Sequence, residues 1–304
     1  MSKKKRRIDR DRYGRGLTDP LPSVEPDSQE RVPVPERPEP KKFNAPLWAG
    51  AIVLVALAGV LLFNIFGSKE QLTVDSLNPP AVAALDGGSA VYPPDSKLAF
   101  TENVKFGYLP APTLAVLGDG TIVAADAETA AKSMGLKKEL DELTASEFDD
   151  ASITPPREGT ESGETITWDE LVDAVGGDTV LMPEITSAKV AGPALETVTD
   201  AGLEDSTIVR TDDAEVARAT ADAGIDAMFT GDVSTASEKS LSETGYTALA
   251  VDADAAADRA GGELDVWATG VKDKKQLETL AEAGVFGALS TNPYEVLPSE
   301  VKTD

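Results

Sequence analysis

The sequence predicts an α/β protein, a (β/α)8 barrel of the TIM type, preceded by one transmembrane helix and a disordered N-terminal tail. Three observations predict this arrangement. One run of 20 uncharged residues lies at 47–66, eight strand-like runs follow it with helical patterns between most of them, and the 238 residues after it suit eight such units. Alternating strands and helices indicate a parallel sheet. An open doubly wound sheet is the alternative, although no G-x-G-x-x-G follows the first strand.

The uncharged run "LWAGAIVLVALAGVLLFNIF" predicts a membrane helix over 46–66. Asn64 is its one polar side chain, and its length at about 1.5 Å per residue gives about 30 Å, the thickness of a bilayer core. A cleaved signal peptide is the alternative. A leader of more than 40 residues precedes the run, however, and no small-x-small site follows it, so we expect an uncleaved anchor.

Charge predicts the orientation of this anchor. The basic, Pro-rich tail at 1–45 holds 12 Lys and Arg against 8 Asp and Glu, whereas the rest of the chain holds 16 against 45. Basic residues favour the cytoplasmic side, so we expect a single-pass protein of the bacterial plasma membrane with a cytoplasmic N-terminus and an extracytoplasmic C-terminal domain. We interpret the basic cluster as a topology and lipid-contact signal, with a partner tag as the alternative. The acidic exterior domain would repel nucleic acid, which we do not expect as a partner.

The chain contains no Cys and no His. This composition excludes disulfides, thiol redox chemistry, Ser-His and Cys-His nucleophile pairs, imidazole bases, and zinc sites built on His or Cys. Any catalysis has to use carboxylates, Lys, Arg, Tyr or hydroxyl groups. An exported domain without disulfides also has to be stabilised by its core alone.

The predicted elements follow one another in order after a linker at 67–78. A strand at 80–86 and a helix at 95–107 open the barrel domain, 79–304. "TLAVL" and "TIVAA" predict a hairpin because Asp119-Gly120 between them favours a turn. A polar insertion spans 127–166, and Thr167 with an acid three residues later opens the next helix. The remaining strands are expected at 179–185, 206–211, 226–232, 248–252, 264–270 and 287–291, and the helices between them at 189–202, 213–223, 236–244, 253–260 and 274–283.

In a barrel of this type the functional residues lie at the carboxyl ends of the strands. Those ends carry Asp86, Asp126, Glu184, Arg210 and Trp267 among others. Their order resembles the glycerophosphodiester phosphodiesterase family, whose members are barrels that cleave glycerophosphodiesters with a divalent metal and two histidines.

The resemblance begins at the first strand. "AALDGGSAVYPPDSKLAF" is similar to the family's strand ending in His-Arg-Gly and its "PENT…AF" helix, with Leu85 and Asp86 where His and Arg stand in the family. "DAET" stands where the family has "HDET", so Asp126 takes the place of the second histidine and Ala127 that of the following acid.

The resemblance continues to about Leu297. The family's two metal-binding carboxylates in "GAD-x-x-E-x-D" fall within 111–114, which contains none. "ITWDELVDAVGGDTVLMPEIT" keeps the glutamate of the family's "E-I-K" as Glu184 and has Thr186 for its lysine. "WATGVKDKKQLETLAEAGVFGALSTNP" keeps Trp267 and has Asn292 for an aspartate.

We interpret these departures as the loss of the family's chemistry, because a divalent cation needs several oxygen ligands and the leaving alkoxide needs an acid. No catalytic residue and no cofactor are predicted, with a divalent cation at Glu184, the only surviving metal ligand, as the alternative. Leu85, Pro112 and Leu114 are expected to make that side of the barrel mouth apolar. The predicted function is a catalytically inactive binding or scaffolding module in the cell envelope. An active phosphoric diester hydrolase of lipid metabolism, using Asp126, Glu184 and Arg210, is the alternative.

The ligand-binding candidates are Glu184, Arg210, Trp267 and Asp126. Glu184 is expected to be a rim carboxylate paired with Arg210. Asp126 is expected to be a solvated residue at a strand end, with a carboxylic acid of raised pKa as the alternative. Trp267 is expected to pack across the barrel mouth, with contact to a sugar or glycerol as the alternative. The membrane and an envelope protein or glycolipid are the predicted partners, and a purely structural tether is a third function.

Overall fold

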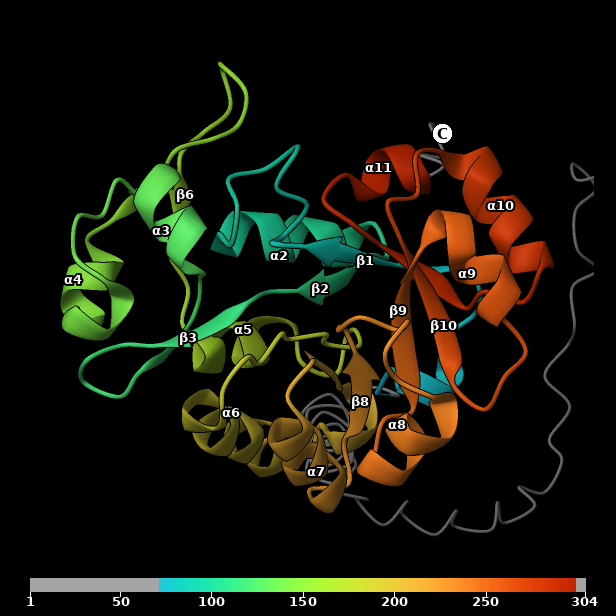
Figure 1. The fold of residues 1–304 in the computed structure, drawn as a ribbon. Helices are drawn as coiled ribbons and strands as arrows, with labels where there is room; N and C mark the ends of the chain where they lie inside the picture. The colour runs from blue at the N-terminus through green and yellow to red at the C-terminus, as the bar shows by residue number, and fades with distance from the viewer. Residues whose placement is uncertain (1–70, 299–304) are drawn as a thin grey trace, which may run out of the picture. The chain divides into compact units, whose positions relative to one another are not determined.

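A computed structural model describes residues 71–298, which belong to the compact unit Ile65–Asp304 (Figure 1). The predicted tail at 1–45 and membrane helix at 46–66 lie outside the described residues. Within 71–298, no helix is both long and apolar enough to cross a membrane.

A curled sheet of seven parallel strands forms the centre of the fold (Figure 1), in the order β2-β1-β11-β10-β9-β8-β7. Most of these strands are short apolar runs that are buried on both faces, as expected for a parallel sheet. The strands are β1 Ala81–Leu85, β2 Leu109–Ala111, β7 Ile208–Thr211, β8 Asp226–Phe229, β9 Ala248–Asp252, β10 Asp265–Thr269 and β11 Gly287–Ser290.

The segment Leu181–Ile185 joins the two edges of this sheet. The amide of Met182 donates to the carbonyl of Pro110 in β2 at 2.8 Å, and the amide of Arg210 in β7 donates to the carbonyl of Pro183 at 2.8 Å. These contacts form isolated parallel bridges and no regular strand, although the sequence predicts a strand at 179–185. Pro183 lacks an N–H, which interrupts the ladder there. The curled sheet with its bridged edges is consistent with a TIM-type fold.

Helices cover the outside of the sheet between successive strands (Figure 1). They are α2 Lys97–Lys105, α5 Trp168–Val175, α6 Ala188–Asp200, α7 Ala214–Asp222, α8 Glu238–Thr244, α9 Ala253–Arg259, α10 Lys274–Glu282 and the short α11 Pro293–Val296. The start predicted at Thr167 is confirmed, since Thr167 and Glu170 form a capping box at the N-terminus of α5. The predicted stop after α8 is also confirmed, because Gly245 adopts the left-handed conformation with φ 111°.

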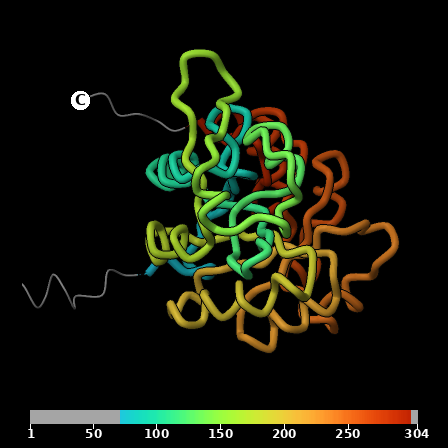
Figure 2. Tube along the Cα trace, turned by 90° about the vertical axis from the view of Figure 1, so that its left-hand side faces the viewer, coloured from blue at the N-terminus to red at the C-terminus, as the bar shows by residue number. Residues whose placement is uncertain are grey.

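Between β2 and α5 the chain makes a lobe beside the sheet. A hairpin of β3 Leu114–Val116 and β4 Ile122–Ala124 is followed by α3 Ala127–Lys132, η2 Leu140–Glu142, α4 Ala145–Asp149, β5 Ser152–Ile153 and β6 Gly163–Glu164. Figure 2 shows this lobe in front of the sheet, with the loop between β5 and β6 at the top. The predicted hairpin is confirmed, since β3 and β4 pair antiparallel around Asp119-Gly120.

The structure corrects the sequence analysis on which strands belong to the parallel sheet. The hairpin, which makes up one of the eight strand positions predicted there, lies outside the parallel sheet. The second strand of the sheet is β2, which the sequence analysis did not single out because it has only three residues and contains Pro110.

The core lies on both faces of the sheet. Inside the curl, Met182, Met228, Trp267 and Leu289 pack with small residues of β1, and the segment before β1, with the short helix η1 Val74–Ser76, packs against them. Two further clusters fill the space between the sheet and the helices, and a small cluster around Phe148 stabilises the lobe.

Candidate functional site

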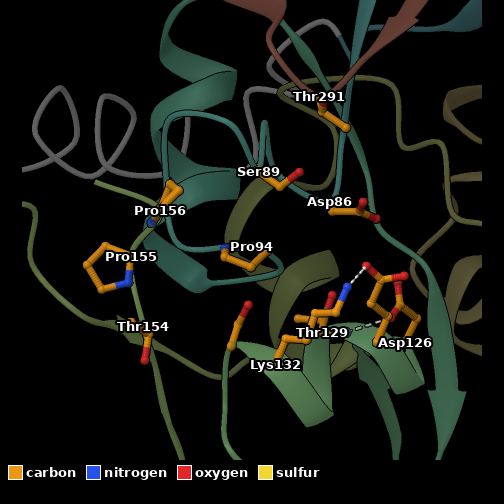
Figure 3. A pocket seen from close by; sticks show the side chains of 12 residues that line it. Asp86, Ser89, Pro94, Asp126, Thr129, Lys132, Thr154, Pro155, Pro156 and Thr291 are labelled. Carbon is orange, nitrogen blue, oxygen red and sulfur yellow. Dashed lines mark hydrogen bonds and ion pairs between the residues drawn. The ribbon is translucent and has the colours of Figure 1, made fainter. Parts of the chain in front are cut away.

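A pocket of about 480 Å³ lies between the end of β1 and the lobe (Figure 3). Asp86 and Asp126 lie on one side of it, and Thr154, Pro155 and Pro156 of the lobe lie on the opposite side. Ser89, Thr129, Lys132 and Thr291 also line it. The structure therefore brings together Asp86 and Asp126, two of the residues that the resemblance places at positions of catalytic family residues.

Asp86 follows the last residue of β1 and starts the loop that leads to α2. Its φ of 50° is left-handed, a conformation that Asp tolerates better than most residues, and its carbonyl accepts a hydrogen bond from the amide of Asp95 at 2.9 Å. Burial raises the pKa of Asp86 to about 6, Arg210 opposes this rise, and Asp126 and Glu184 add to it. Asp86 therefore titrates closer to neutral pH than an ordinary aspartate does.

Asp95 closes the same loop, one residue before Ser96 caps α2. Its exposed fraction is 0%, and neither of its carboxylate oxygens has a hydrogen-bond partner among the described residues. Burial raises the pKa of Asp95 well above its ordinary value, and the charges of Asp86 and Asp126 raise it further, while the Thr129 side chain and Arg210 lower it. The sequence analysis missed Asp95 as a site residue, since the only signal is an acid placed directly before the cap of a helix.

Asp126 is the N-cap of α3, and its Oδ1 accepts a hydrogen bond from the amide of Thr129 at 2.7 Å (Figure 3). Asp126 is partly buried and caps a helix, so it is less solvated than the sequence analysis expected for a residue at the end of a strand. Asp86, Asp95 and Asp126 each place one carboxylate oxygen within 4.8 Å of the other two. Three aspartates from two distant segments thus meet at the edge of the pocket.

Arg210 lies inside the curled sheet, where its exposed fraction is 3%. Its Nε donates to the carbonyl of Met182 at 2.8 Å, and its Nη2 donates to the carbonyls of Ala111 and Pro112, both at 3.1 Å. Its Nη1 lies 3.3 Å from Oε2 of Glu184, which confirms the expected pair. The guanidinium therefore fills the space between the end of β2 and Glu184.

This space does not fit a divalent metal ion. Glu184 is already in contact with the guanidinium, and the segment 111–114 adds no carboxylate and only the hydroxyl of Thr113, 3.5 Å from Glu184. Asp86, which also interacts with Thr113 and Arg210, lines the neighbouring pocket. A hard divalent cation needs several oxygen ligands to replace its hydration shell, and a neighbouring positive charge repels it.

Two apolar residues expected at the mouth lie elsewhere. Leu114 has an exposed fraction of 2% and packs in the cluster between the sheet and α5 and α6, since it begins β3 outside the curl. Leu85 is partly buried and packs against the interior cluster. Neither residue lines the pocket beside Asp86.

Trp267 is buried inside the curl, with an exposed fraction of 1%. Its ring lies 5.4 Å from that of Phe286, which directly precedes β11 and so lies toward the amino ends of the strands. The expected packing role is consistent with this burial, but the expected position across the mouth is wrong. Trp267 does not line the pocket that contains Asp86 and Asp126.

No protein-family model and no curated protein matches the sequence. Solved structures do match the fold. The chain is similar to a glycerophosphodiester phosphodiesterase from Agrobacterium tumefaciens str. C58, with a TM-score of 0.62, 13% identity, and coverage of 71% of this chain and 98% of that one. It is also similar to a phosphodiesterase from Oleispira antarctica in complex with the product sn-glycerol-3-phosphate, with a TM-score of 0.62, 15% identity, and coverage of 71% and 95%.

A third similar structure is the glycerophosphodiester phosphodiesterase from Thermotoga maritima, with a TM-score of 0.58, 16% identity, and coverage of 71% and 96%. The three structures share the fold of this chain over nearly their whole length. The family resemblance noted in the sequence is therefore confirmed at the level of the fold.

Proposed function

We propose that this chain is a membrane-anchored, extracytoplasmic binding or scaffolding module on a glycerophosphodiesterase-like barrel, and that it does not hydrolyse phosphodiesters. One observation carries the proposal: the buried guanidinium of Arg210 occupies the space beside Glu184 where the resemblance places the family's metal. The proposal includes no catalytic cofactor.

The missing groups act on separate parts of the reaction. A metal ion would polarise the phosphodiester, and an acid would protonate the leaving alkoxide. The chain has no histidine for the second role, and Arg210 is fixed by three carbonyls and cannot be deprotonated. General acid–base catalysis alone typically contributes about 10²- to 10⁴-fold, so the joint loss of both groups leaves little rate.

A second candidate function is an active phosphodiesterase with unusual groups, and Asp86 is the observation that favours it. Its pKa of about 6 and its position on the pocket would suit a general acid or base near neutral pH. In this reading Asp86 would exchange a proton with the substrate while Lys132 at the pocket edge would attract the phosphate. Lys132 already pairs with Glu128 at 2.6 Å, which weakens that attraction.

The test is the turnover of glycerophosphocholine and glycerophosphoethanolamine by the full-length chain, in EDTA and with added Mg²⁺ or Ca²⁺. We expect no release of glycerol phosphate above the level given by the Asp86→Asn variant. Turnover that disappears in Asp86→Asn but persists in the Asp252→Asn control would establish the second function. Asp252 is a suitable control because it caps α9 at the end of another strand and does not line the pocket.

For the partners we propose the membrane and an envelope protein or glycolipid, and no nucleic acid. What supports this is the predicted membrane helix at 46–66 together with 45 acidic residues after the tail. The alternative function as a structural tether can be tested separately, because a tether requires the N-terminal tail to bind its cytoplasmic partner. A chain lacking 1–44 should keep its function as a ligand-binding barrel and lose it as a tether.

A further inference from the structure

We propose that Asp86, Asp95 and Asp126 together bind one divalent cation of the size of Ca²⁺ at the inner end of the pocket. This site adjoins the space beside Glu184, because Asp86 also interacts with Arg210 and Glu184, but Glu184 is not one of its ligands. It goes beyond the proposed binding role and does not require the absence of hydrolysis.

The spacing of the three carboxylates suits one shared ion. Their nearest oxygens all lie within 4.8 Å of one another. Ca²⁺ holds its oxygen ligands at about 2.3 to 2.6 Å, so two ligands of one ion can be at most about 5 Å apart. Mg²⁺ demands a near-ideal octahedral arrangement at about 2.1 Å and dehydrates reluctantly, so a cluster of protein carboxylates suits the more flexible coordination of Ca²⁺ better.

The buried carboxylate of Asp95 is the independent evidence for a ligand. It is fully buried, neither oxygen has a hydrogen-bond partner within 3.5 Å among the described residues, and one of its oxygens lies within 4.8 Å of an oxygen of Asp86 and of an oxygen of Asp126. A buried carboxylate without a partner is strongly unfavourable, and bound cations are one of the few ways in which proteins compensate for it.

The basic side chains nearest to the cluster form no ion pair with it, although the charge of Arg210 attracts Asp86 and Asp95 at longer range. Arg210 directs its donors to the carbonyls of Met182, Ala111 and Pro112 and to Glu184. Lys132 is an exposed residue that pairs with Glu128. Among the described residues, no Lys or Arg forms an ion pair with any of the three aspartates.

The elements around the cluster hold it in place and leave a route to solvent. Asp86 and Asp95 start and end one loop, joined by the hydrogen bond between the Asp95 amide and the Asp86 carbonyl, and Asp126 is fixed as the cap of α3. Asp86 and Asp126 line the pocket, whereas Asp95 lies behind them. An ion could therefore enter from the pocket and keep water molecules on that side.

The experiment is isothermal titration calorimetry of Ca²⁺ into the full-length chain after EDTA treatment and dialysis. We expect saturable binding of one ion, with a Kd of about 0.1 to 1 mM, the range of weakly charged sites outside the cell. Asp95→Asn and Asp126→Asn should each weaken binding roughly tenfold or more, because each removes one charged ligand. Both variants should fold, since Asn tolerates the left-handed backbone at position 95 and caps helices as well as Asp does at position 126.

The control variant is Asp252→Asn, a capping aspartate at the end of β9 that is outside the cluster and should bind as the wild type does. Weak, unsaturated uptake by every variant would show diffuse attraction to the acidic surface and overturn the proposal. Saturable binding that persists in Asp95→Asn and Asp126→Asn would place the ion elsewhere and also overturn it. The turnover assay is a separate readout, so failure of this site and failure of the proposed function can be told apart.

Discussion

At the scale of single residues, Arg210 and Asp95 are two buried charges with opposite environments. Arg210 donates to three carbonyls and contacts Glu184, whereas Asp95 accepts no hydrogen bond among the described residues. A buried ion with partners becomes essential to the structure around it, while one without partners destabilises the fold. The two residues therefore predict mutational effects of opposite sign.

Replacing Arg210 by Leu should lower the free energy of unfolding by about 3 to 5 kcal/mol, the usual effect of removing one partner of a buried ion pair. The carbonyls of Ala111, Pro112 and Met182 would lose their donor at the same time. Urea unfolding followed by tryptophan fluorescence measures the change. Arg218→Leu, at an exposed position of α7, should stay within about 0.5 kcal/mol of the wild type. Equal effects of the two variants would contradict the assigned role of Arg210.

Replacing Asp95 by Asn should stabilise the metal-free protein at neutral pH. Burial raises the pKa of Asp95 in the folded state. The unfolded chain releases this proton near its ordinary pKa of about 3.9, so the wild type loses stability as the pH rises from there through the folded pKa. In EDTA, the free energy of unfolding of Asp95→Asn should therefore exceed that of the wild type at pH 7, and the two should converge near pH 3.9.

An opposite pH dependence is expected for Asp119→Asn, which serves as the control for Asp95→Asn. The pKa of Asp119 is lowered, first by the hydrogen bond that it accepts from the amide of Ala145. Its ionised form therefore stabilises the wild type above the unfolded pKa, and this contribution is lost as the pH falls through the folded pKa. Urea unfolding at a series of pH values compares the two variants, and a decrease in stability of Asp95→Asn at pH 7 would contradict the prediction.

At the scale of elements, the capping residues set where the helices begin. Thr167 and Glu170 satisfy each other's backbone amides at the start of α5, and Asp126, Asp213, Asp252 and Asp273 cap four other helices. Such side chains satisfy amides that have no partner within the helix. The caps thus connect short sequence signals to the positions of the helices.

Replacing Thr167 by Ala should lower the free energy of unfolding by about 1 kcal/mol, the typical effect of losing an N-cap. The exposed Thr279 within α10 gives the comparison, because Thr279→Ala removes a hydroxyl that caps no helix N-terminus. Thermal and urea unfolding of both variants measure the effect. A loss of stability in Thr279→Ala as large as in Thr167→Ala would argue against the capping explanation.

Strong local signals could be predicted from the sequence, and contacts between distant segments could not. The caps, the hairpin around Asp119-Gly120 and the order of most strands and helices depend on neighbouring residues, and the structure has them. The strand β2 was missed because three residues with a proline carry no strand pattern. Asp95 was missed because its burial and its approach to Asp126, 31 positions away, depend on the complete fold.

The same limit applied to residues predicted at the barrel mouth. The pair of Glu184 and Arg210 was predicted because both lie near the carboxyl ends of two neighbouring predicted strands, and parallel strands bring such ends together. Trp267 was placed too near the mouth, since its position along β10 does not determine whether its ring points toward the amino or the carboxyl ends of the strands. Side-chain direction within a packed interior is set by neighbours such as Phe286.

At the scale of the whole molecule, the chain combines a basic tail, a predicted membrane helix and an acidic barrel. The residues after the tail hold 16 Lys and Arg against 45 Asp and Glu, and this negative charge attracts cations in general. A site for one cation therefore has to be distinguished from this background by saturation and by point variants. The same charge distribution gives a clear expectation for topology.

Fractionation of cells that express the full-length chain should recover it with the membrane, and alkaline carbonate should not release it, as expected for a membrane-spanning helix at 46–66. Protease added outside spheroplasts should digest the acidic domain and leave an epitope tag at the N-terminus intact. Protection of the domain, with digestion of the N-terminal tag, would reverse the proposed orientation. Release by carbonate would contradict the anchor.

The segment Leu181–Ile185, which joins the two edges of the sheet, has a consequence for hydrogen exchange. Everywhere else neighbouring strands of the sheet pair through regular ladders, but here two edges meet through isolated bridges, and Arg210 joins Met182 to the end of β2. Pro183 has no N–H, so one ladder bond is missing along this line, and a region that lacks such bonds opens at lower free energy than the rest of a fold. The sheet should thus open first along Leu181–Ile185. The amides of Met182 and Glu184 should therefore exchange with deuterium sooner than those of β9 and β10. Loss of the Arg210 side chain should speed the exchange of these two amides more than that of the amides elsewhere in the sheet.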